Sequence, residues 1–438
     1  MPSRNSLTRL SSQPSCWGES EVPGLRSRHD GLERQYDVVI IGAGLTGLAA
    51  ALASLENGLS VAVIEHGRPG AGASGRNSGF VIPTLARLMP ADIERMLGGD
   101  AARKLIDAIG DAAAGLFEAL RTDGADIGAM QTGWLQPDTC DASAQLMRTR
   151  FAAWKRAGAN VRLLGADEVV AKTGSSYYRS ALFYPDGGQI DPLALTRHLC
   201  DQVLRQGGTL LTELPVLRWS RPGAHSIYTV ETSLGSVRGR SLIVASNANS
   251  DDGTRRLRRA TIPFALVLAT FALDPAYEDR VLPAHAPMSD SRKDMWFFRR
   301  LGAGRILTGM IATSSSKPIA SIEMELRCRI ETVFRSPAGD MQQMWAGQAG
   351  LTPNGLPQIF GFDEGSYGWT GCNGRGLVLS VLLGKTLAAL AAGDNPERQI
   401  LPVSRFKELP GRRLMATVGR SIVQIDRWKR ARDPRRFQ

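Results

Sequence analysis

Residues 36–47 read Tyr-Asp-Val-Val-Ile-Ile-Gly-Ala-Gly-Leu-Thr-Gly, and this stretch decides the fold of the first part of the chain. The apolar run 38–41 predicts a buried strand that leads into glycines spaced as G-x-G-x-x-G. Gly42 allows the tight turn, Gly44 lets the backbone approach a pyrophosphate, and Gly47 lets a following helix pack closely on the strand. The spacing therefore predicts the first half of a dinucleotide-binding unit.

The residues after the glycines complete this unit. Leu45 and Thr46 open the predicted helix, whose free N–H groups and positive end suit a pyrophosphate. A second apolar run, residues 59–64, ends on Glu65, which can accept hydrogen bonds from ribose hydroxyls. His66 follows, and it lies either near the adenosine or on the surface. The motif alone does not separate NAD from FAD, and a glycine-rich turn in an ordinary α/β sheet is the alternative.

The composition is typical of a globular protein. The chain has 438 residues, 43% hydrophobic and 22% charged, which fits two domains or one large interleaved unit. No apolar run is long enough to span a bilayer. The five cysteines are scattered, at Cys16, Cys140, Cys200, Cys328 and Cys372. Without a C-x-x-C pair or a histidine cluster, we expect neither a disulfide framework nor a metal site, and we predict a cytoplasmic location.

Much of the net charge of +11 lies at the two ends of the chain. The first 34 residues contain five arginines among Ser, Pro and Gly, without the apolar core of a secretory signal. We expect an extended surface arm; a transit peptide is the alternative, and four acidic residues argue against it. Residues 405–436 predict an amphipathic helix with a basic face, docked on the body. A membrane surface or an acidic partner is the other possible contact, and nucleic acid is not favoured because aromatic interleaving is lacking.

Two further glycine-rich stretches lie far from the first. Residues 70–79 read GAGASGRNSG, which excludes a stable helix or central strand and predicts a loop able to wrap a ligand. Residues 371–376 read GCNGRG and precede a clear helix at 377–392. This second turn could set another positive helix end against a ligand, or it is a plain helix start.

Six stretches in a fixed order carry a resemblance. They are the glycine motif at 42–47, GASGRNSG at 72–79, DGGQIDP at 186–192, ASNA at 245–248, LTPNGLP at 351–357 and NGRG at 373–376. This combination resembles the FAD-dependent oxidoreductases of the D-amino-acid oxidase superfamily, which includes glycine and sarcosine oxidases. The form GASGRNSG looks most like the γ-glutamylputrescine oxidase branch. The resemblance covers residues 36–392.

The resemblance implies an α/β protein with a Rossmann-like FAD-binding domain of discontinuous segments and an inserted antiparallel-sheet substrate domain. The FAD-binding segments would be residues 36–105, 190–255 and 340–398. The substrate domain would comprise residues 106–189 and 256–339. A flexible or surface arm at 1–35 and a basic helical extension at 399–438 would flank them.

The resemblance also assigns roles to residues. The adenosine and pyrophosphate would lie on Gly42, Gly44, Leu45, Thr46, Gly47, Glu65 and His66, with the backbone of Val216 at the adenine. The flavin ring would meet the loop Ser74, Gly75, Arg76, Asn77 and Ser78. Asn247 and the turn Gly374, Arg375 and Gly376 would hold the rest of the flavin. Residues 296–298 and 305–310 would form a roof above it.

The implied reaction is oxidation of a primary or secondary amine or amino acid by hydride transfer to flavin N5, giving an imine that hydrolyses. Arg375 or its helix end would face the negative charge that develops on the flavin. Arg76 would approach the ring or a substrate carboxylate, or else satisfy loop carbonyls. Arg299 or Arg300 would be the other carboxylate anchor, with only one of them facing the cavity. Trp296 and Phe298 would share a face, as cavity walls or as core.

Two departures from the superfamily bear on the chemistry. Sarcosine-type oxidases carry a lysine that aids reaction with oxygen. The corresponding position in this chain falls near Leu307, so the electron acceptor stays open between oxygen and another compound. The cysteine that tethers flavin in some relatives has no match at residues 349–351, so we expect noncovalent FAD. A flavin-bearing dehydrogenase or binding protein that meets an acidic partner, RNA or a membrane surface, through the basic ends is the alternative. An NAD-dependent dehydrogenase needs neither of the later glycine-rich turns.

Overall fold

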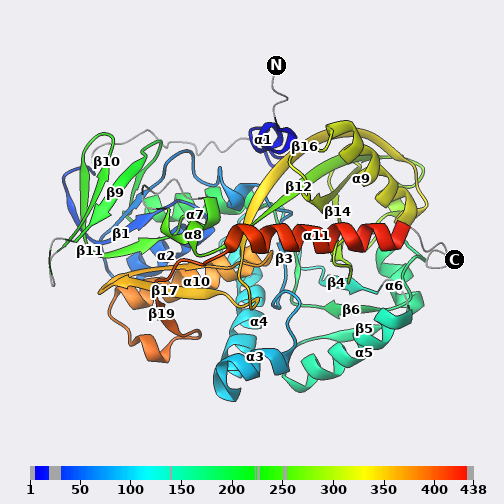
Figure 1. Cartoon of the computed structure of the whole chain (residues 1–438), viewed down its shortest axis with the longest axis horizontal. Helices are drawn as coiled ribbons and strands as arrows, with labels where there is room; N and C mark the ends of the chain where they lie inside the picture. Colours follow the sequence, from blue (N-terminus) through cyan, green and yellow to red (C-terminus); the bar gives the residue numbers. More distant parts are fainter. Residues whose placement is uncertain are drawn as a thin grey trace.

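The computed structural model describes residues 5–18, 31–138, 141–221, 223, 227–249, 253 and 255–431. Two sheets lie side by side, one in each half of the molecule, and the long helix α11 (Arg412–Ala431) runs from the middle across the half that contains β12 and β14 (Figure 1). Within these ranges, no helix is both long and apolar enough to cross a membrane.

The first sheet is built around β1 (Gln35–Ile41), which pairs in parallel with β2 and β11. The strands run in the order β19-β17-β18-β11-β1-β2-β8, with β10 and β9 continuing antiparallel from β11. Their bounds are β2 Val61–Ile64, β8 Thr209–Leu211, β9 Val216–Ser220, β10 Tyr228–Thr232, β11 Ser236–Val244, β17 Gln358–Asp363, β18 Ser366–Thr370 and β19 Val403–Arg405. The central strands are buried because helices and the meander cover both faces, which explains their unbroken apolar runs.

Helices α2 (Leu45–Glu56), α7 (Pro192–Arg205) and α10 (Gly376–Ala391) belong to this half. Gly47 permits the contact between α2 and β1, because a Cβ there would lie 1.9 Å from the carbonyl oxygen of Gly42. Gly384 does the same between helices: its Cβ would lie 2.6 Å from the Thr46 oxygen. Both glycines therefore let α2 sit tightly between the sheet and α10.

The second sheet runs in the order β16-β12-β15-β14-β13-β4-β6-β5, and all its pairings except β13 with β4 are antiparallel. Its strands are β4 Trp134–Pro137, β5 Arg162–Leu164, β6 Ala181–Tyr184, β12 Ile262–Leu273, β13 Met288–Ser289, β14 Phe297–Leu301, β15 Arg305–Ile311 and β16 Ala338–Leu351. The other helices are α1 Ser6–Ser11, α3 Pro90–Leu97, α4 Gly99–Thr122, α5 Asp141–Arg156, α6 Ala166–Thr173, α8 Arg256–Arg259 and α9 Ile319–Phe334. A small pair, β3 (Phe80–Val81) with β7 (Gly188–Gln189), lies near the junction.

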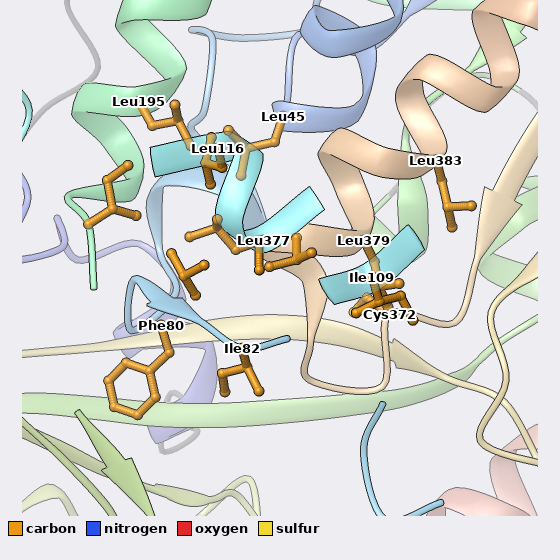
Figure 2. Close-up of a cluster of buried hydrophobic side chains, with 14 of the residues drawn as sticks. Leu45, Phe80, Ile82, Ile109, Leu116, Leu195, Cys372, Leu377, Leu379 and Leu383 are labelled. Atoms are coloured by element: carbon orange, nitrogen blue, oxygen red, sulfur yellow. The ribbon is translucent and has the colours of Figure 1, made fainter. Parts of the chain in front are cut away.

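A continuous apolar core joins the halves. Figure 2 shows part of it, where side chains of α2, α4, α7 and α10 meet those that follow the loop 70–79. The labelled members are Leu45, Phe80, Ile82, Ile109, Leu116, Leu195, Cys372, Leu377, Leu379 and Leu383. The same core extends to Trp345 and Phe297 of the second sheet.

The expected α/β fold, a Rossmann-like sheet of discontinuous segments beside an antiparallel sheet, is confirmed. One boundary differs from the sequence-based assignment. Strand β16 (Ala338–Leu351) pairs with β12 in the antiparallel sheet, although residues 340–398 were expected in the FAD-binding part. Residues 5–18 also differ from an extended arm, because they contain helix α1 and the buried residues Leu10 and Ser15. Residues 1–4 and 19–30 of the arm lie outside the described residues.

Candidate active site

A cavity of about 430 Å³ lies between the two sheets. The glycine motif, the loop 70–78, strands β12, β14 and β16, and the turn before α10 all contribute to its wall. Most of the residues assigned to the cofactor line it: Gly42, Gly44, Leu45, Thr46, Glu65, His66, Ser74, Arg76, Asn77, Ser78, Val216, Asn247, Gly374, Arg375 and Gly376. Gly47 and Gly75 lie behind the wall, where each packs against backbone.

The glycine motif forms part of one end of the cavity. Gly42 has a φ of +107°, which favours glycine, and a Cβ on Gly44 would lie 2.8 Å from the Ser74 hydroxyl. The Leu45 N–H, at the start of α2, donates to Ser74 Oγ over 3.0 Å. A helix start whose N-cap residue, Gly44, has no capping side chain is the arrangement that binds a pyrophosphate.

Glu65 is held rigidly at the tip of β2. Its Oε2 accepts from the Ala43 N–H over 2.8 Å, and its Oε1 accepts from the Gly67 N–H over 2.9 Å. Burial raises the pKa of this carboxyl, although the two N–H donors oppose the shift. The carboxylate has acceptor capacity left for ribose hydroxyls.

The loop that faces the predicted flavin ring is organised by Asn77. Its Nδ2 donates to the carbonyls of Ala73 (3.1 Å) and Ser74 (2.7 Å), and its Oδ1 accepts from the Gly79 N–H at 2.8 Å. These bonds close the loop on itself, so its backbone can face the cavity without regular secondary structure.

A second set of contacts holds this loop from outside, and sequence reasoning missed it. Residues 5–18, which we call the N-terminal strap, lie against its outer side. Ser15 Oγ donates to the Gly75 carbonyl over 2.8 Å, and Trp17 Nε1 donates to the Asn77 carbonyl over 2.9 Å. No pattern in residues 5–18 predicts this contact, because the bonded residues lie 60 positions apart.

Arg76 joins the loop to the strap and to β16. Its Nε donates to the Ala346 carbonyl over 2.9 Å, and its Nη2 donates to the Leu10 carbonyl over 3.2 Å. The indole of Trp345 in turn donates to the Arg76 carbonyl over 3.0 Å. Arg76 lines the cavity, but these bonds support the reading in which its guanidinium satisfies backbone carbonyls.

Arg299 was expected to be a carboxylate anchor in the cavity, but the structure places it behind the cavity wall. Its Nη1 donates to the carbonyls of Ile190 (2.7 Å) and Ser78 (2.9 Å). Burial lowers the pKa of this guanidinium to about 10. Arg300, the neighbour on the other face, pairs with Glu278 at 3.3 Å. Neither guanidinium lines the cavity. Arg299, on the inward face of β14, bonds to backbone carbonyls, and Arg300 pairs with Glu278.

The roof differs in detail from the expectation. Phe297 of β14, Leu266 and Leu268 of β12, and Met295 line the cavity, and β15 does not. Trp296 and Phe298 lie on the opposite face, since side chains alternate along a strand. The Phe298 ring packs 5.1 Å from that of Phe334, so it belongs to the core. These four side chains make the roof mainly apolar.

Arg375 places a positive charge at the cavity wall. It caps α10 and lines the cavity, with its guanidinium carbon 4.7 Å from the centre of the Trp134 ring. Among the described residues, no carbonyl or carboxylate accepts a hydrogen bond from it, and its Nε is buried without a partner. Burial, with the like charges of Arg150 and Arg87 nearby, lowers its pKa to about 9. A buried cation of this kind is stabilised by a bound anion.

Other orphaned polar atoms line the same cavity. Asn247 Oδ1 and Ser289 Oγ are buried and have no partner in the described part of the chain. The helix end at Arg375 and Gly376 is likewise free of a side-chain cap there. Together with the start of α2, these groups fit FAD: phosphates at one helix end and the polar edge of the flavin at the other.

The thiol of Cys372 also lines the cavity. It donates weakly to the Gly350 carbonyl over 3.7 Å, and burial raises its pKa. A protonated thiol is a poor nucleophile, which agrees with FAD held without a covalent bond. No cluster of three or more His, Cys, Asp or Glu suited to a metal ion occurs among the described residues.

Comparison with known proteins gives the family. The profile described as "DAO: FAD dependent oxidoreductase" matches residues 37–390. Gamma-glutamylputrescine oxidoreductase of Escherichia coli (strain K12) is 27% identical over 364 residues, which cover 82% of this chain and 84% of that protein.

Solved structures show the same fold. Glycine oxidase from Geobacillus kaustophilus has a TM-score of 0.66 at 20% identity, covering 82% of this chain and 95% of that one. L-amino acid deaminase from Proteus vulgaris, with its specific insertion deleted, has a TM-score of 0.69 at 18% identity, covering 87% and 97%. The chain belongs to the DAO family of FAD-dependent oxidoreductases.

Proposed function

We propose that this enzyme oxidises a primary or secondary amine, or an amino acid, at the carbon that bears the nitrogen. The product imine would then hydrolyse to a carbonyl compound. Family membership and the similarity to a gamma-glutamylputrescine oxidoreductase and to glycine oxidases support this substrate class. When bound, FAD supplies the two-electron acceptor that takes hydride from that carbon.

The observation that carries the proposal is the unpaired guanidinium of Arg375 at the cavity. Arg76, Arg299 and Arg300 are already occupied by carbonyls or carboxylates. Arg375 therefore remains available to stabilise an anion in the cavity. That anion is either the negative charge that develops on the cofactor or the carboxylate of an amino-acid substrate.

The roof would favour the uncharged form of the amine. Phe297, Leu266 and Leu268 present apolar surface, and burying an ammonium there without a partner is costly. The substrate would thus bind after losing its proton to water, and a protein base is not required. Ser289 Oγ is the buried polar atom of the roof that can orient the amine nitrogen. Gln348, an exposed lining residue, marks where the cavity meets solvent.

Anaerobic titration of the FAD-loaded protein tests the function. We would add paired amines with and without a carboxylate, such as glycine with methylamine and sarcosine with dimethylamine, and also γ-glutamylputrescine. Loss of the flavin absorbance with at least one amine is the expected result. Protein that takes up FAD but is reduced by no amine in a broad panel contradicts the proposal. A preference for the carboxylated member of each pair would assign the anion at Arg375 to the substrate.

The electron acceptor is the second question. No lysine lines the cavity in the described part of the chain, and Leu307 is buried in β15 away from it. We propose an acceptor other than oxygen on this basis. Admitting air to the amine-reduced enzyme tests it, because slow return of the absorbance in air with rapid return on adding a quinone is expected. The free thiols of Cys16, Cys200, Cys328 and Cys372 support a reducing, cytoplasmic location for this reaction.

A further inference from the structure

Helix α11 (Arg412–Ala431) touches the body along one narrow side. Ala416 and Val423 are its buried apolar residues. Arg427 fixes the same side, because its Nη2 donates to Asp294 Oδ1 over 2.6 Å and to the Ile311 carbonyl over 2.9 Å. Near its start, Arg412 Nη1 donates to the Arg258 carbonyl over 3.2 Å. Figure 1 shows the helix running from the middle of the molecule across the half that contains β12 and β14.

The opposite side of α11 is apolar and faces solvent. We call these residues the outer stripe: Leu414, Met415, Val418, Ile422, Ile425 and Trp428, with 37% to 69% of each side chain exposed. At 3.6 residues per turn they fall on one face, turned about half a revolution from Ala416 and Val423. The stripe holds half of the twelve exposed large apolar side chains in the described part of the chain. Such a concentration marks a contact surface.

Positive charge accompanies the outer stripe: at 3.6 residues per turn Lys429 falls within it, whereas the exposed Arg413 and Arg420 fall toward the side of Ala416. Residues 412–431 contain six arginine or lysine residues and a single acidic residue, Asp426. Arg413, Arg420 and Lys429 are exposed. The sequence beyond the helix, residues 432–438, adds three arginines against one aspartate. An occupant of this surface must therefore offer apolar contact and negative charge together.

We propose that the outer stripe docks α11 flat on an anionic lipid surface. Apolar side chains would enter the headgroup boundary while arginine and lysine meet lipid phosphates, as in interfacial amphipathic helices. Trp428 has the amphipathic ring that suits this depth. A second copy fits less well, because two α11 helices of the same net positive charge repel each other. The inference goes beyond the proposed oxidation and does not depend on it.

Vesicle flotation of the full-length, FAD-loaded protein tests the proposal. Vesicles of phosphatidylcholine with phosphatidylglycerol are compared with phosphatidylcholine alone. The triple variant Val418→Ser, Ile422→Ser and Ile425→Ser removes the centre of the stripe without touching the buried side of the helix. We expect it to reduce partition to the anionic vesicles about tenfold or more. Added salt should also weaken wild-type binding, since surface charges are screened.

A matched control exchanges exposed apolar residues elsewhere: Val170→Ser, Leu234→Ser and Met324→Ser. This variant should float like the wild type, and the absorbance of bound FAD checks that each protein is folded. If the wild-type protein does not float with anionic vesicles, the proposal is wrong. It is also wrong if the stripe variant floats as well as the wild type. The occupant is a second copy instead if three results hold together. Light scattering shows a wild-type dimer, the stripe variant is a monomer, and neither protein binds lipid.

Discussion

The guanidinium carbon of Arg299 lies 4.6 Å from the centre of the Trp17 indole ring. Both residues also hold neighbouring carbonyls of the loop 70–79, which lines the cavity. Trp17 Nε1 donates to Asn77 and Arg299 Nη1 donates to Ser78, each over 2.9 Å. The shape of a cofactor-facing loop is thus fixed from its outer side, by one residue near the start of the chain and another from strand β14.

Substitution Trp17→Ala should weaken FAD binding about tenfold. It removes one hydrogen bond to the loop and the cation–π contact with Arg299, which together contribute roughly 1–2 kcal/mol. FAD binding requires the ordered loop, so most of this loss should reach the dissociation constant. Fluorescence titration of the FAD-free protein with FAD measures it. Thr8→Ala, an exposed position in the same strap, should leave the affinity unchanged. Equal affinities for all three proteins would show that the strap does not shape the loop.

Arg299→Met separates a structural role from substrate anchoring. The change leaves the carbonyls of Ile190 and Ser78 without their donor inside the protein. We expect a loss of about 2–3 kcal/mol in the free energy of unfolding. With FAD saturating, the KM for a carboxylated amine should stay within about twofold, because the guanidinium does not line the cavity. A large rise in KM with unchanged stability would restore the anchoring role that the sequence suggested.

The sequence could predict the parts of the site that depend on local backbone geometry. The turn at Gly42, the acid at Glu65 and the turn before α10 all follow from glycine spacing beside apolar runs. Strand alternation also predicted that only one of Arg299 and Arg300 faces inward. Strand alternation could not predict which groups the inward side chain contacts, because only the tertiary fold brings the carbonyls of Ile190 and Ser78 to Arg299.

Two other features carried no local signal. The hydrogen bond between Ser15 and Gly75 joins residues 60 positions apart, and neither segment contains a pattern that predicts this contact. Strand β16 (Ala338–Leu351) is rich in glycine and glutamine and lacks an alternating pattern, so its place beside β12 is set by cross-strand packing. The sequence places Arg375 in the turn before α10, but its lack of a partner is visible only in three dimensions.

Arg375→Met should separate stability from activity. The FAD-free protein should gain about 1 kcal/mol in unfolding free energy, because a buried cation without an anion is replaced by an apolar side chain of similar length. Turnover of the FAD-loaded enzyme should fall about a hundredfold or more, since the anion of the reaction loses its partner. Denaturant melts of the FAD-free form and anaerobic stopped-flow reduction measure the two effects. Arg420→Met, an exposed arginine of α11, is the control and should change neither. A destabilised variant with normal turnover would assign Arg375 a purely structural role.

Gly47→Ala and Gly115→Ala should have opposite effects although both glycines lie in helices. A Cβ on Gly47 would lie 1.9 Å from the Gly42 oxygen, whereas a Cβ on Gly115 meets nothing within 4 Å. The first change should cost about 3 kcal/mol or more through overpacking and abolish FAD retention. The second should stabilise α4 by about 0.5–1 kcal/mol, the helix propensity difference. Thermal unfolding with and without FAD measures both, and equal effects would show that α2 is not closely packed on the turn.

The anchorage of α11 should depend on pH through Glu325. This carboxylate accepts from Arg329 Nη2 over 2.7 Å and lies 3.7 Å from Arg427 Nε. Burial opposes its ionisation, but Arg329, Lys317 and Arg427 together lower its pKa below the ordinary value of 4.5. The folded-state pKa thus lies below the unfolded one. The resulting stabilisation is complete above pH 4.5 and is lost as the pH falls through the folded-state value.

Glu325→Gln should therefore remove about 1 kcal/mol at neutral pH and little once the pH is well below 4.5. Urea melts across this range measure the difference, and hydrogen exchange should show α11 opening first, because Arg427 is its main link to the body. Glu323→Gln changes a carboxylate on the same helix that pairs with Arg327 at 3.3 Å and does not touch α11. It should leave the exchange of α11 unaltered at every pH. If Glu325→Gln and wild type lose stability in parallel as the pH falls, the ion cluster does not hold α11 in place.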